Sequence, residues 1–427
     1  IRRHLRQRLP TVTGEPAMET PPGLRAVVLV KSALMPRDMG RFGISALQEA
    51  GYDTLVVDVA ALLHPEATFD RGHYPALPVR IEVIDTVRGL RRVEELFRAA
   101  DICFCYVASR HVRLADIPVL RLLTRTRLPY VLFMHNAIPG AAKTEWRGGV
   151  LTRLSERLHR LSAIKPLDSL VSRLPLGWLG IAPAVAAVYG GTASMTPSRL
   201  VDGSTAAILA HSWDYDEAGL HQGHAAEVTE IAVFIDQFLP FHPDWVEYPG
   251  CNHLDPDQYY GNLRLLFDRI DRELGLKTVV AAHPRSDYET RPQLFGDRPV
   301  VKGNSIELMR QSRLVIGHYS LALANAVLFE KPVLLLTSKS FGESLIRMEL
   351  FARAYADALG SVLESMDAPH AIDLNGRLRH DHAAYQRFRQ RWIKQDGTPQ
   401  RPLFQIVLDA LQGLRLRRRD REPGHAV

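Results

Sequence analysis

Long apolar runs and cysteines are scarce in this sequence, and each scarcity excludes a class of protein. No stretch approaches the roughly 18 uninterrupted apolar residues of a membrane-spanning helix. The first 22 residues are basic and then rich in Pro, Thr and Glu, without the apolar core of a signal peptide. We therefore expect residues 1–23 to be a disordered leader. Three cysteines in 427 residues make no disulfide framework, which fits a reducing cytoplasm.

Signatures of metal and nucleic-acid binding are also missing. Cys103 and Cys105 alternate within an apolar run, as buried strand residues do. The histidines His242, His253 and His318 show no metal-ligand spacing. There is no basic stripe interleaved with aromatics and no helix-turn-helix pattern, so we expect no nucleic-acid partner.

Strand-like and helical segments alternate along the whole chain. A chain of 427 residues exceeds one comfortable core, so we expect two domains. Continuous apolar runs separated by amphipathic segments predict parallel strands buried on both faces. The expected strands span 25–30, 54–58, 101–107, 129–134, 205–210, 231–235, 277–282, 299–301, 313–317 and 331–336. The expected helices include 44–50, 256–275, 321–329 and 403–414.

These segments predict an α/β fold of two Rossmann-like domains facing across a cleft. The first domain spans 24–216 and the second 230–397. Residues 398–427 would form a helix that crosses back to the first domain, followed by a basic tail. Open α/β sheets bind ligands beyond the carboxyl ends of their strands, which places the expected site at that edge.

Two short motifs follow strands of the predicted second domain. His283, Pro284 and Arg285 come directly after the strand 277–282. The run 317–320, Gly-His-Tyr-Ser, follows the strand 313–317 and opens a helix. A glycine allows close backbone approach, and a serine before a helix offers hydroxyl and amide donors to an anion. Together with cationic side chains they predict a phosphate site, although either motif alone is equally explained by capping or packing.

The order of these motifs resembles the donor half of bacterial GT-B glycosyltransferases that use CMP-activated ulosonic acids. The similar run extends from His283-Pro284 through 317–320 to 330–333, Glu-Lys-Pro-Val. The resemblance covers the second half of the chain, and the first half only in architecture. It implies that His283 and Ser320 contact CMP. The predicted nucleotide site also includes Pro284, Arg285, Gly317 and Tyr319.

A second resemblance concerns Asp236, which follows the first strand of the second domain. This segment and 210–216 are similar to the retaining β-Kdo transferases of capsule and O-antigen synthesis. In that family an aspartate in the matching position is the proposed nucleophile. The resemblance implies transfer of Kdo (3-deoxy-D-manno-octulosonic acid) from CMP-Kdo to a surface polysaccharide with retention. A capping or salt-bridged aspartate is an equally good explanation of Asp236 from the sequence alone.

The remaining candidate residues lie on the expected acceptor side. Glu145 is the candidate general base that would deprotonate the acceptor hydroxyl. His135, Asn136, His211 and Asp214 are expected to touch the sugar or acceptor. The triplet 214–216, Asp-Tyr-Asp, has the D-x-D form of metal-dependent transferases. A CMP donor carries one phosphate and needs no such clamp, so we expect no metal and no other cofactor.

Several alternatives stay open at this point. The donor could be CMP-sialic, legionaminic or pseudaminic acid, or a UDP- or GDP-sugar whose ribose is held by Glu307. The chain could also be an inactive GT-B-like module that binds glycan. The arginine-rich stretch 411–421 is either a solvated tail or a contact to anionic lipid. With a lipid-linked acceptor, the protein would then work at the inner face of the inner membrane.

Overall fold

The computed structural model describes residues 23–108, 111–140, 168, 171, 173–220, 228–242, 254–344 and 346–419. Its contacts divide them into two compact units. The first unit comprises the described residues up to Asn136, those of 168–211, and those from Gly397 onward. The second comprises 137–140 and the described residues of 212–396. Over this part of the chain, no helix has both the length and the apolarity needed to cross a membrane.

The first unit is built on a seven-stranded sheet in the order β3-β2-β1-β4-β5-β6-β7. All of its neighbouring strands run parallel. Its strands are β1 (Arg25–Val30), β2 (Asp53–Asp58), β3 (Arg80–Val83), β4 (Ile102–Cys105), β5 (Tyr130–Phe133), β6 (Ala186–Tyr189) and β7 (Ala206–Leu209). Consecutive residues of β1 are buried on both faces, as the continuous apolar run predicts.

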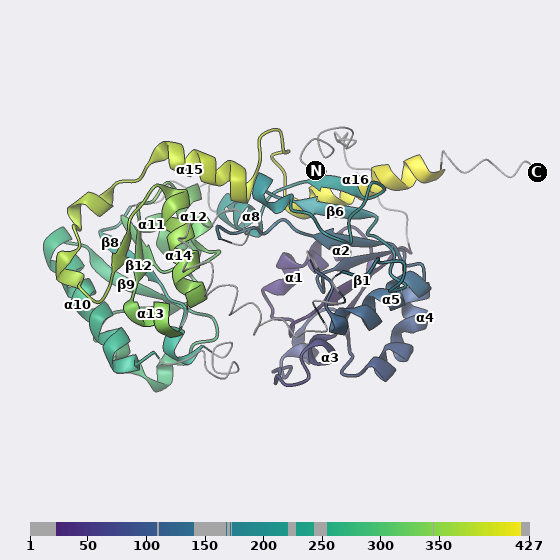
Figure 1. Cartoon of the computed structure of the whole chain (residues 1–427), viewed down its shortest axis with the longest axis horizontal. Helices are drawn as coiled ribbons and strands as arrows, with labels where there is room; N and C mark the ends of the chain where they lie inside the picture. Colours follow the sequence, from purple (N-terminus) through teal and green to yellow (C-terminus); the bar gives the residue numbers. More distant parts are fainter. Residues whose placement is uncertain are drawn as a thin grey trace, which may run out of the picture. The chain divides into compact units, whose positions relative to one another are not determined.

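Helices cover the two faces of this sheet. They are α1 (Asp38–Arg41), α2 (Ile44–Glu49), α3 (Ala60–Leu63), α4 (Glu94–Arg98), α5 (Ile117–Arg125) and the C-terminal α16 (Leu403–Arg419). One face joins Cys103 and Cys105 to α5 in a single apolar cluster. On the opposite face, the ring of Phe404 in α16 lies 6.1 Å from that of Phe104 and 5.9 Å from that of Phe133, measured between centroids. Figure 1 shows α16, in yellow, within this unit.

The second unit has a six-stranded parallel sheet in the order β10-β9-β8-β11-β12-β13. Its strands are β8 (Ile231–Ile235), β9 (Lys277–Ala282), β10 (Val300–Lys302), β11 (Leu314–Gly317), β12 (Val333–Thr337) and β13 (Leu363–Ser365). Counted within the unit, the order is third, second, first, fourth, fifth, sixth, which is the Rossmann order. The order reverses between β8 and β11, and ligands bind at such a switch point.

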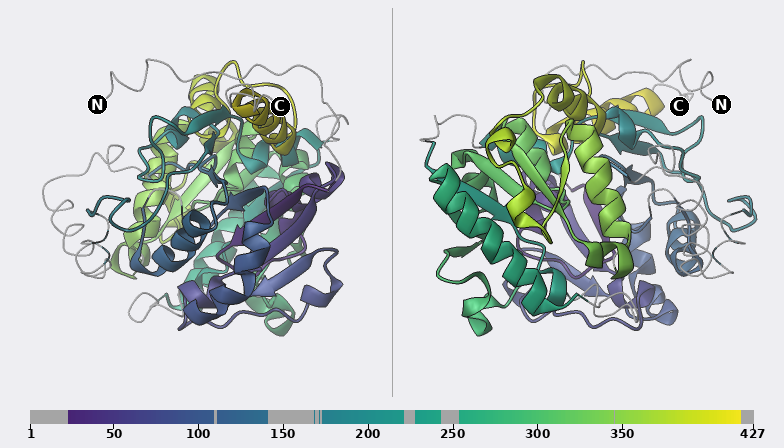
Figure 2. Two further views of the ribbon diagram at one scale, coloured as in Figure 1. Left: turned by 90° about the vertical axis from the view of Figure 1, so that its right-hand side faces the viewer. Right: turned by 60° about the vertical axis from the view of Figure 1, so that its left-hand side comes forward.

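Helices also cover both faces of the second sheet (Figure 2). They are α8 (Trp213–Leu220), α10 (Pro256–Leu274), α11 (Ser305–Gln311), α12 (Leu323–Leu328), α13 (Lys339–Ser344), α14 (Ile346–Leu359) and α15 (His382–Phe388), which continues into a π-helical turn (Arg389–Ile393). The buried side of α10 packs on alternate strand residues such as Phe234 and Val280. The strand residues between these point to the opposite face, where α11 contacts β8 and β9. Asp255 caps α10 by accepting from Asp257 N–H at 2.9 Å.

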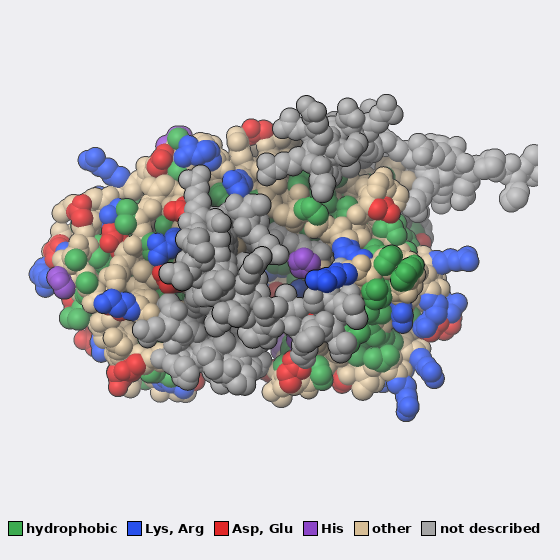
Figure 3. Space-filling view, in the orientation of Figure 1, with side chains coloured by type: hydrophobic (Ala, Val, Ile, Leu, Met, Phe, Trp, Pro, Cys, Tyr) green, Lys and Arg blue, Asp and Glu red, His purple; other side chains and the backbone are tan. Residues whose placement is uncertain are grey.

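Charged side chains are spread over the surface of each unit. Exposed arginines pair with nearby carboxylates, for example Arg80 with Glu82 and Arg353 with Glu349, each at 2.8 Å. On the face seen in Figure 3, Lys and Arg side chains lie interspersed with Asp and Glu. The visible Lys and Arg side chains of this face are therefore not gathered in one stripe.

Each strand expected from the sequence is present, with ends that shift by up to a few residues. The structure adds β3, β6 and β13, which the sequence analysis missed. β3 and β13 lie at sheet edges, and each carries charged or polar residues where an apolar run would signal a strand. β6 is half alanine and has one β-branched residue, Val188, so its strand signal is weak. The helix expected over 256–275 is observed as α10, with Gly275 in the left-handed C-cap conformation.

Candidate functional site

Three polar residues gather at the carboxyl edge of the second sheet, around its switch point. Asp236 follows β8, His283 follows β9, and His318 follows β11. The strands lie side by side in the order β9-β8-β11, so their ends meet at one edge. The structure thus brings together the segments of both predicted nucleotide motifs and Asp236 within one unit.

Asp236 is buried and fully engaged with protein donors. The residue is only 4% exposed. Oδ1 accepts from the backbone N–H of Phe238 at 2.9 Å. Oδ2 accepts from the backbone N–H of His283 at 3.1 Å and from the hydroxyl of Tyr288 at 2.9 Å. The carboxylate therefore joins the loop after β8 to the His-Pro turn after β9.

The environment of Asp236 favours its neutral form. Burial raises the pKa of Asp236 from 3.8 to about 6, and the hydrogen bonds from Phe238, His283 and Tyr288 oppose that rise. Burial also raises the pKa of Tyr288 far above its ordinary value, so its hydroxyl remains a donor. A carboxyl group that titrates near pH 6 can change charge under mild conditions, which is a property of many reactive sites and of some structural networks.

His318 forms a second buried link at the same edge. It is 1% exposed, and burial lowers its pKa from 6.5 to about 4, so the ring is neutral near pH 7. Nδ1 lies 2.9 Å from the carbonyl oxygen of Leu336, which can only accept, so Nδ1 carries the proton. Nε2 then accepts from the hydroxyl of Tyr259 at 2.9 Å. His318, at the end of β11, is therefore hydrogen-bonded to both β12 and α10.

The His-Pro-Arg motif forms an accessible turn over this network. His283 is half-buried, and Pro284 and Arg285 are exposed. The Nδ1 atom of His283 accepts from the backbone N–H of Arg285 at 3.2 Å, while its carbonyl accepts from the Ser286 hydroxyl at 2.7 Å. The ring of His242 lies 4.8 Å from that of His283, edge to face. These contacts order the turn, in which Arg285 is exposed.

Lysines near the same edge differ in their availability. Lys302 Nζ donates to the Ser286 carbonyl at 2.6 Å and pairs with Glu289 at 3.3 Å. It is thus occupied within the protein. Lys339 follows β12 and is exposed. Lys339 and the exposed Arg285 are cationic candidates for a phosphate at this edge.

The residues after β11 are arranged as a tight turn. Gly317 lies against Ile235, and an added Cβ would meet ordinary van der Waals distances. Tyr319 stacks on Phe351 with centroids 5.1 Å apart. The Ser320 hydroxyl accepts from the backbone N–H of Ala322 at 3.2 Å, and the Ser320 carbonyl accepts from the Tyr355 hydroxyl at 2.9 Å. Half-buried Tyr319 and Ser320 leave part of this turn accessible.

The predicted acceptor residues divide between the units. His135 and His211 are buried and Asn136 is half-buried, all in the first unit, after β5 and β7. Burial lowers the pKa of His135 to about 3, with a further contribution from His211. His211 Nε2 donates to the carbonyl of Arg401 at 2.9 Å. Asp214 belongs to the second unit. Glu145 lies outside the described residues.

Asp214 and Asp216 do not face the same way. Both lie in the first turn of α8, and residues two apart on a helix point in different directions. Asp214 is buried and accepts from the Asn325 amide at 3.5 Å, within the second unit. The helical spacing disfavours one metal ion shared by these two carboxylates.

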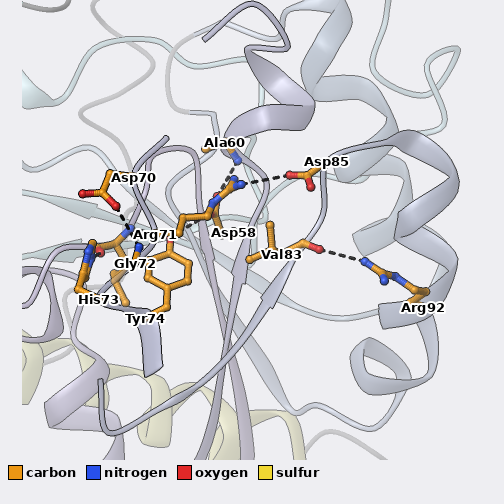
Figure 4. Close-up of polar contacts among 11 residues, drawn as sticks. Asp58, Ala60, Asp70, Arg71, Gly72, His73, Tyr74, Val83, Asp85 and Arg92 are labelled. Atoms are coloured by element: carbon orange, nitrogen blue, oxygen red, sulfur yellow. Dashed lines mark hydrogen bonds and ion pairs between the residues drawn. The ribbon is translucent and has the colours of Figure 1, made fainter. Parts of the chain in front are cut away.

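An acidic residue at the end of β2 serves the first unit internally (Figure 4). Asp58 is fully buried and accepts from Arg71 Nε and the Tyr74 hydroxyl, each at 2.7 Å, and from Ala60 N–H at 2.8 Å. Dinucleotide-binding Rossmann domains use an acidic residue near this point to hold a ribose. Here Arg71 and Tyr74 engage that carboxylate, which favours a role in ordering the loop after β2.

One hollow of the second unit lies at the opposite end of β9. It encloses about 750 Å³ and is lined by residues that include Arg264, Lys277 and Arg298. Arg298 is already bound to Asp268 at 2.6 Å and Asp271 at 2.8 Å. Because Rossmann-type sheets bind ligands at the carboxyl ends of their strands, we place the candidate site at Asp236 and His283 and not in this hollow.

Sequence reasoning missed the tyrosines that complete the site. Tyr259, Tyr260 and Tyr288 are buried, and the Tyr260 and Tyr288 hydroxyls lie 3.1 Å apart. Residues 259–260 lie on the buried side of α10, where the apolar residues of the helix recur. In the sequence they therefore look like ordinary core residues. The one usable signal was polarity, since a buried tyrosine hydroxyl needs a partner.

No family model and no curated protein sequence matches this chain. Among solved structures it is similar to the calicheamicin glycosyltransferase CalG4, at 13% identity and a TM-score of 0.50, over 91% of this chain and 99% of that one. It also resembles SnogD from Streptomyces nogalater, at 14% identity and a TM-score of 0.48, over 92% and 99%. The likeness to CalG4 shows the fold: the chain has two Rossmann-like domains of the GT-B type, which confirms the fold class expected from the sequence.

Proposed function

We propose that this protein is a glycosyltransferase that takes its sugar from a nucleotide donor bound at the carboxyl edge of the second sheet. The observation that carries the proposal is the Asp236–His283 network at the switch point of a Rossmann-ordered sheet. The GT-B fold, which CalG4 shares, supports the reaction class by analogy. The accessible Arg285 and the half-buried turn at Ser320 supply cationic and hydrogen-bonding groups suited to a phosphate.

The donor we propose is CMP-Kdo, and the acceptor is a growing bacterial surface polysaccharide. Support comes from the ordered motifs His283-Pro284 and Gly317-to-Ser320, which resemble those of CMP-ulosonate transferases. A nucleoside monophosphate leaving group presents one phosphate, and the cationic groups at this edge suit a single anionic group. In this proposal Arg285 and Lys339 balance the phosphate and sugar carboxylate charges, and no metal ion takes part.

The proposed reaction retains the anomeric configuration through Asp236. A carboxylate oxygen of Asp236 would form a bond to the anomeric carbon while the bond from that carbon to the CMP phosphate breaks. The acceptor hydroxyl would then displace the aspartate, and its proton would pass to a carboxylate, for which Glu145 is the candidate. This role requires Asp236 to be ionised and to exchange a protein hydrogen bond for the sugar.

A UDP- or GDP-sugar is the second candidate donor, and one observation weighs against it. Glu307, the residue expected to hold the ribose of such a donor, accepts from Arg310 at 2.6 Å. It is also hydrogen-bonded to Gln311 on the same helix, which leaves its carboxylate engaged within α11.

Nucleotide binding and product analysis test the proposal together. Thermal melting of the protein is recorded with CMP, CDP, UDP and GDP, each with and without Mg²⁺. We expect CMP alone to raise the melting temperature, without a metal requirement, and Arg285→Ala to reduce that rise. Arg291→Ala is a matched control and should leave the rise unchanged, because the Arg291 guanidinium is engaged by Asp287 and by the ring of Phe241. Stabilisation by UDP or GDP alone would discard the donor, and the absence of transfer from CMP-Kdo despite CMP binding would favour an inactive glycan-binding module.

A further inference from the structure

Two histidines and a glutamate lie together on the second unit, among residues that the proposed reaction does not use. Glu330 sits between α12 and β12, while His380 lies just before α15 and His382 is its first residue. Each offers one ligand atom, and these atoms all lie within 4.8 Å of one another. Glu330 and His382 are exposed and His380 is half-buried, so an ion from solvent can reach them.

The turn that carries Glu330 is fixed by the end of α12. Glu330 has a left-handed backbone with φ of 54°, an uncommon conformation for a residue with a side chain. Its N–H donates to the Val327 carbonyl at 3.2 Å, and the next N–H, of Lys331, donates to Ala326 at 2.8 Å. This helix-ending geometry sets the direction in which the carboxylate leaves the turn.

The histidine segment is fixed in turn by the start of α15. Asp381, between the two histidines, caps the helix by accepting from Ala384 N–H at 3.0 Å. The ring of His380 stacks on Tyr385 with centroids 4.5 Å apart and planes at 27°. Tyr385 is buried, and its hydroxyl donates to the Lys331 carbonyl at 2.8 Å. One side chain thus orients His380 and binds its helix to the turn of Glu330.

The spacing of the nearest two ligand atoms suits a shared ion. Nδ1 of His382 lies 3.6 Å from Oε1 of Glu330. Two ligands about 2.0–2.2 Å from a tetrahedral Zn²⁺ are separated by roughly 3.3–3.6 Å. Nε2 of His382 lies 3.4 Å from the Gln386 amide nitrogen. If the amide nitrogen and oxygen of Gln386 are exchanged, the amide oxygen accepts a hydrogen bond from Nε2–H of His382 while Nδ1 binds the metal. Outer partners of metal-bound histidines accept in this way.

We propose that Glu330, His380 and His382 bind Zn²⁺ or a similar divalent transition-metal ion, with water completing the coordination. Two imidazoles and one carboxylate suit Zn²⁺, Co²⁺ and Ni²⁺, whereas Mg²⁺ and Ca²⁺ prefer oxygen ligands throughout. The ion links the turn between α12 and β12 to the start of α15. Its contribution is to the stability of the second unit and is independent of the proposed transfer reaction. Without an ion, an exposed His–Glu pair contributes little to stability.

The test uses the full chain, stripped of metal with a chelator and returned to chelator-free buffer at pH 7.5. Zn²⁺ alone is titrated against a chromophoric competitor, and the melting temperature is followed. We expect His380→Ala/His382→Ala to bind one Zn²⁺ per chain fewer than the wild type, and Glu330→Gln to bind that ion at least 10-fold more weakly. The control, His370→Ala, removes another exposed histidine of the same unit and should bind as the wild type does.

Two further readouts sharpen the outcome. Zn²⁺ should raise the melting temperature of the wild type and of His370→Ala more than that of the double variant, and Mg²⁺ should raise none. Co²⁺ should give visible absorption bands of a low-coordinate site that the double variant lacks. The comparison uses a double variant that is folded without metal. If it binds Zn²⁺ with the same stoichiometry and affinity as the wild type, the proposal is overturned, as it is if the wild type binds no Zn²⁺.

Discussion

Oδ2 of Asp236 accepts a hydrogen bond from the backbone N–H of His283 at 3.1 Å. This bond joins the ends of β8 and β9, so the candidate nucleophile also holds the candidate nucleotide-binding turn. Tyr288 donates to the same oxygen, and Phe238 N–H to the other. Chemistry and positioning are therefore two separable roles for one carboxylate, and the two make different predictions.

Replacement of Asp236 by alanine separates those roles. If Asp236 is the nucleophile, Asp236→Ala should lower transfer by at least about 10³-fold, because the covalent route is lost. Its affinity for CMP should change by less than about 10-fold, since the turn keeps the Ser286 bonds to the His283 carbonyl. Turnover is measured with CMP-Kdo, and CMP affinity by calorimetry.

Tyr288→Phe is the matched control for that experiment. It removes one donor to Asp236 and leaves the carboxylate in place, so most of the transfer activity should remain. Wild-type turnover by Asp236→Ala would exclude the covalent mechanism. A loss of CMP affinity in parallel with the loss of turnover would show that Asp236 acts only by positioning His283.

The buried carboxyl of Asp236 should make stability depend on pH with a defined sign. Its pKa is raised from 3.8 to about 6 by burial, so between these values the folded state holds a proton that the unfolded state has released. The corresponding stability is present below pH 3.8 and is lost as the pH rises through 6, in total about 3 kcal/mol. Urea unfolding of the wild type and of Asp236→Asn at a series of pH values measures this. The wild type should lose stability relative to the variant as the pH rises, and a constant difference would contradict the network.

His318 should produce the opposite dependence. Its pKa is lowered from 6.5 to about 4 by burial, so its contribution is present above pH 6.5 and is lost as the pH falls through 4. The full change is about 3 kcal/mol. His318→Gln keeps one donor toward Leu336 and one acceptor toward Tyr259 but does not titrate. Its unfolding free energy should fall less steeply in acid than that of the wild type, and parallel curves would refute the neutral buried ring.

The sequence predicted the sheet edge of the site but not its interior. Because β8, β9 and β11 are continuous apolar runs, their ends could be located, and parallel topology implies that Asp236 and His283 meet. That Tyr288 would turn back onto Asp236 depends on the path of a loop and on side-chain rotamers. Neither leaves a periodic signal, so the third donor could be identified only in three dimensions.

The proposed metal site shows the same limit more strongly. His380 and His382 lie two residues apart, but Glu330 is about 50 residues earlier in the chain, and no motif spacing joins them. Their approach follows from the way α15 returns to the turn before β12, through the Tyr385 bond to Lys331. Such a return depends on tertiary packing, which residue patterns alone do not specify.

The packing of the C-terminal helix on the first sheet gives the final prediction. Gly43 begins α2 in a left-handed conformation with φ of 72°, and an added Cβ there would overlap the ring of Phe404 in α16. That ring is held between Phe104 and Phe133 and has little room to move. Gly51 in the same unit has φ of 83°, but no atom lies within 4 Å of the position of an added Cβ. Both alanine substitutions cost about 1 kcal/mol in backbone strain, and Gly43→Ala should cost about 1–3 kcal/mol more from the overlap.

A double-mutant cycle attributes this difference to the contact itself. Phe404→Ala alone should destabilise the protein by about 3–5 kcal/mol, because it empties a buried aromatic position. In the Phe404→Ala background the overlap is gone, so Gly43→Ala should cost no more than Gly51→Ala does. Urea unfolding gives all the free energies of unfolding. The double variant should lose about 1–3 kcal/mol less stability than the sum of the losses in the two single variants. If Gly43→Ala and Gly51→Ala are equally costly in the wild-type background, α16 does not pack against the start of α2 in solution.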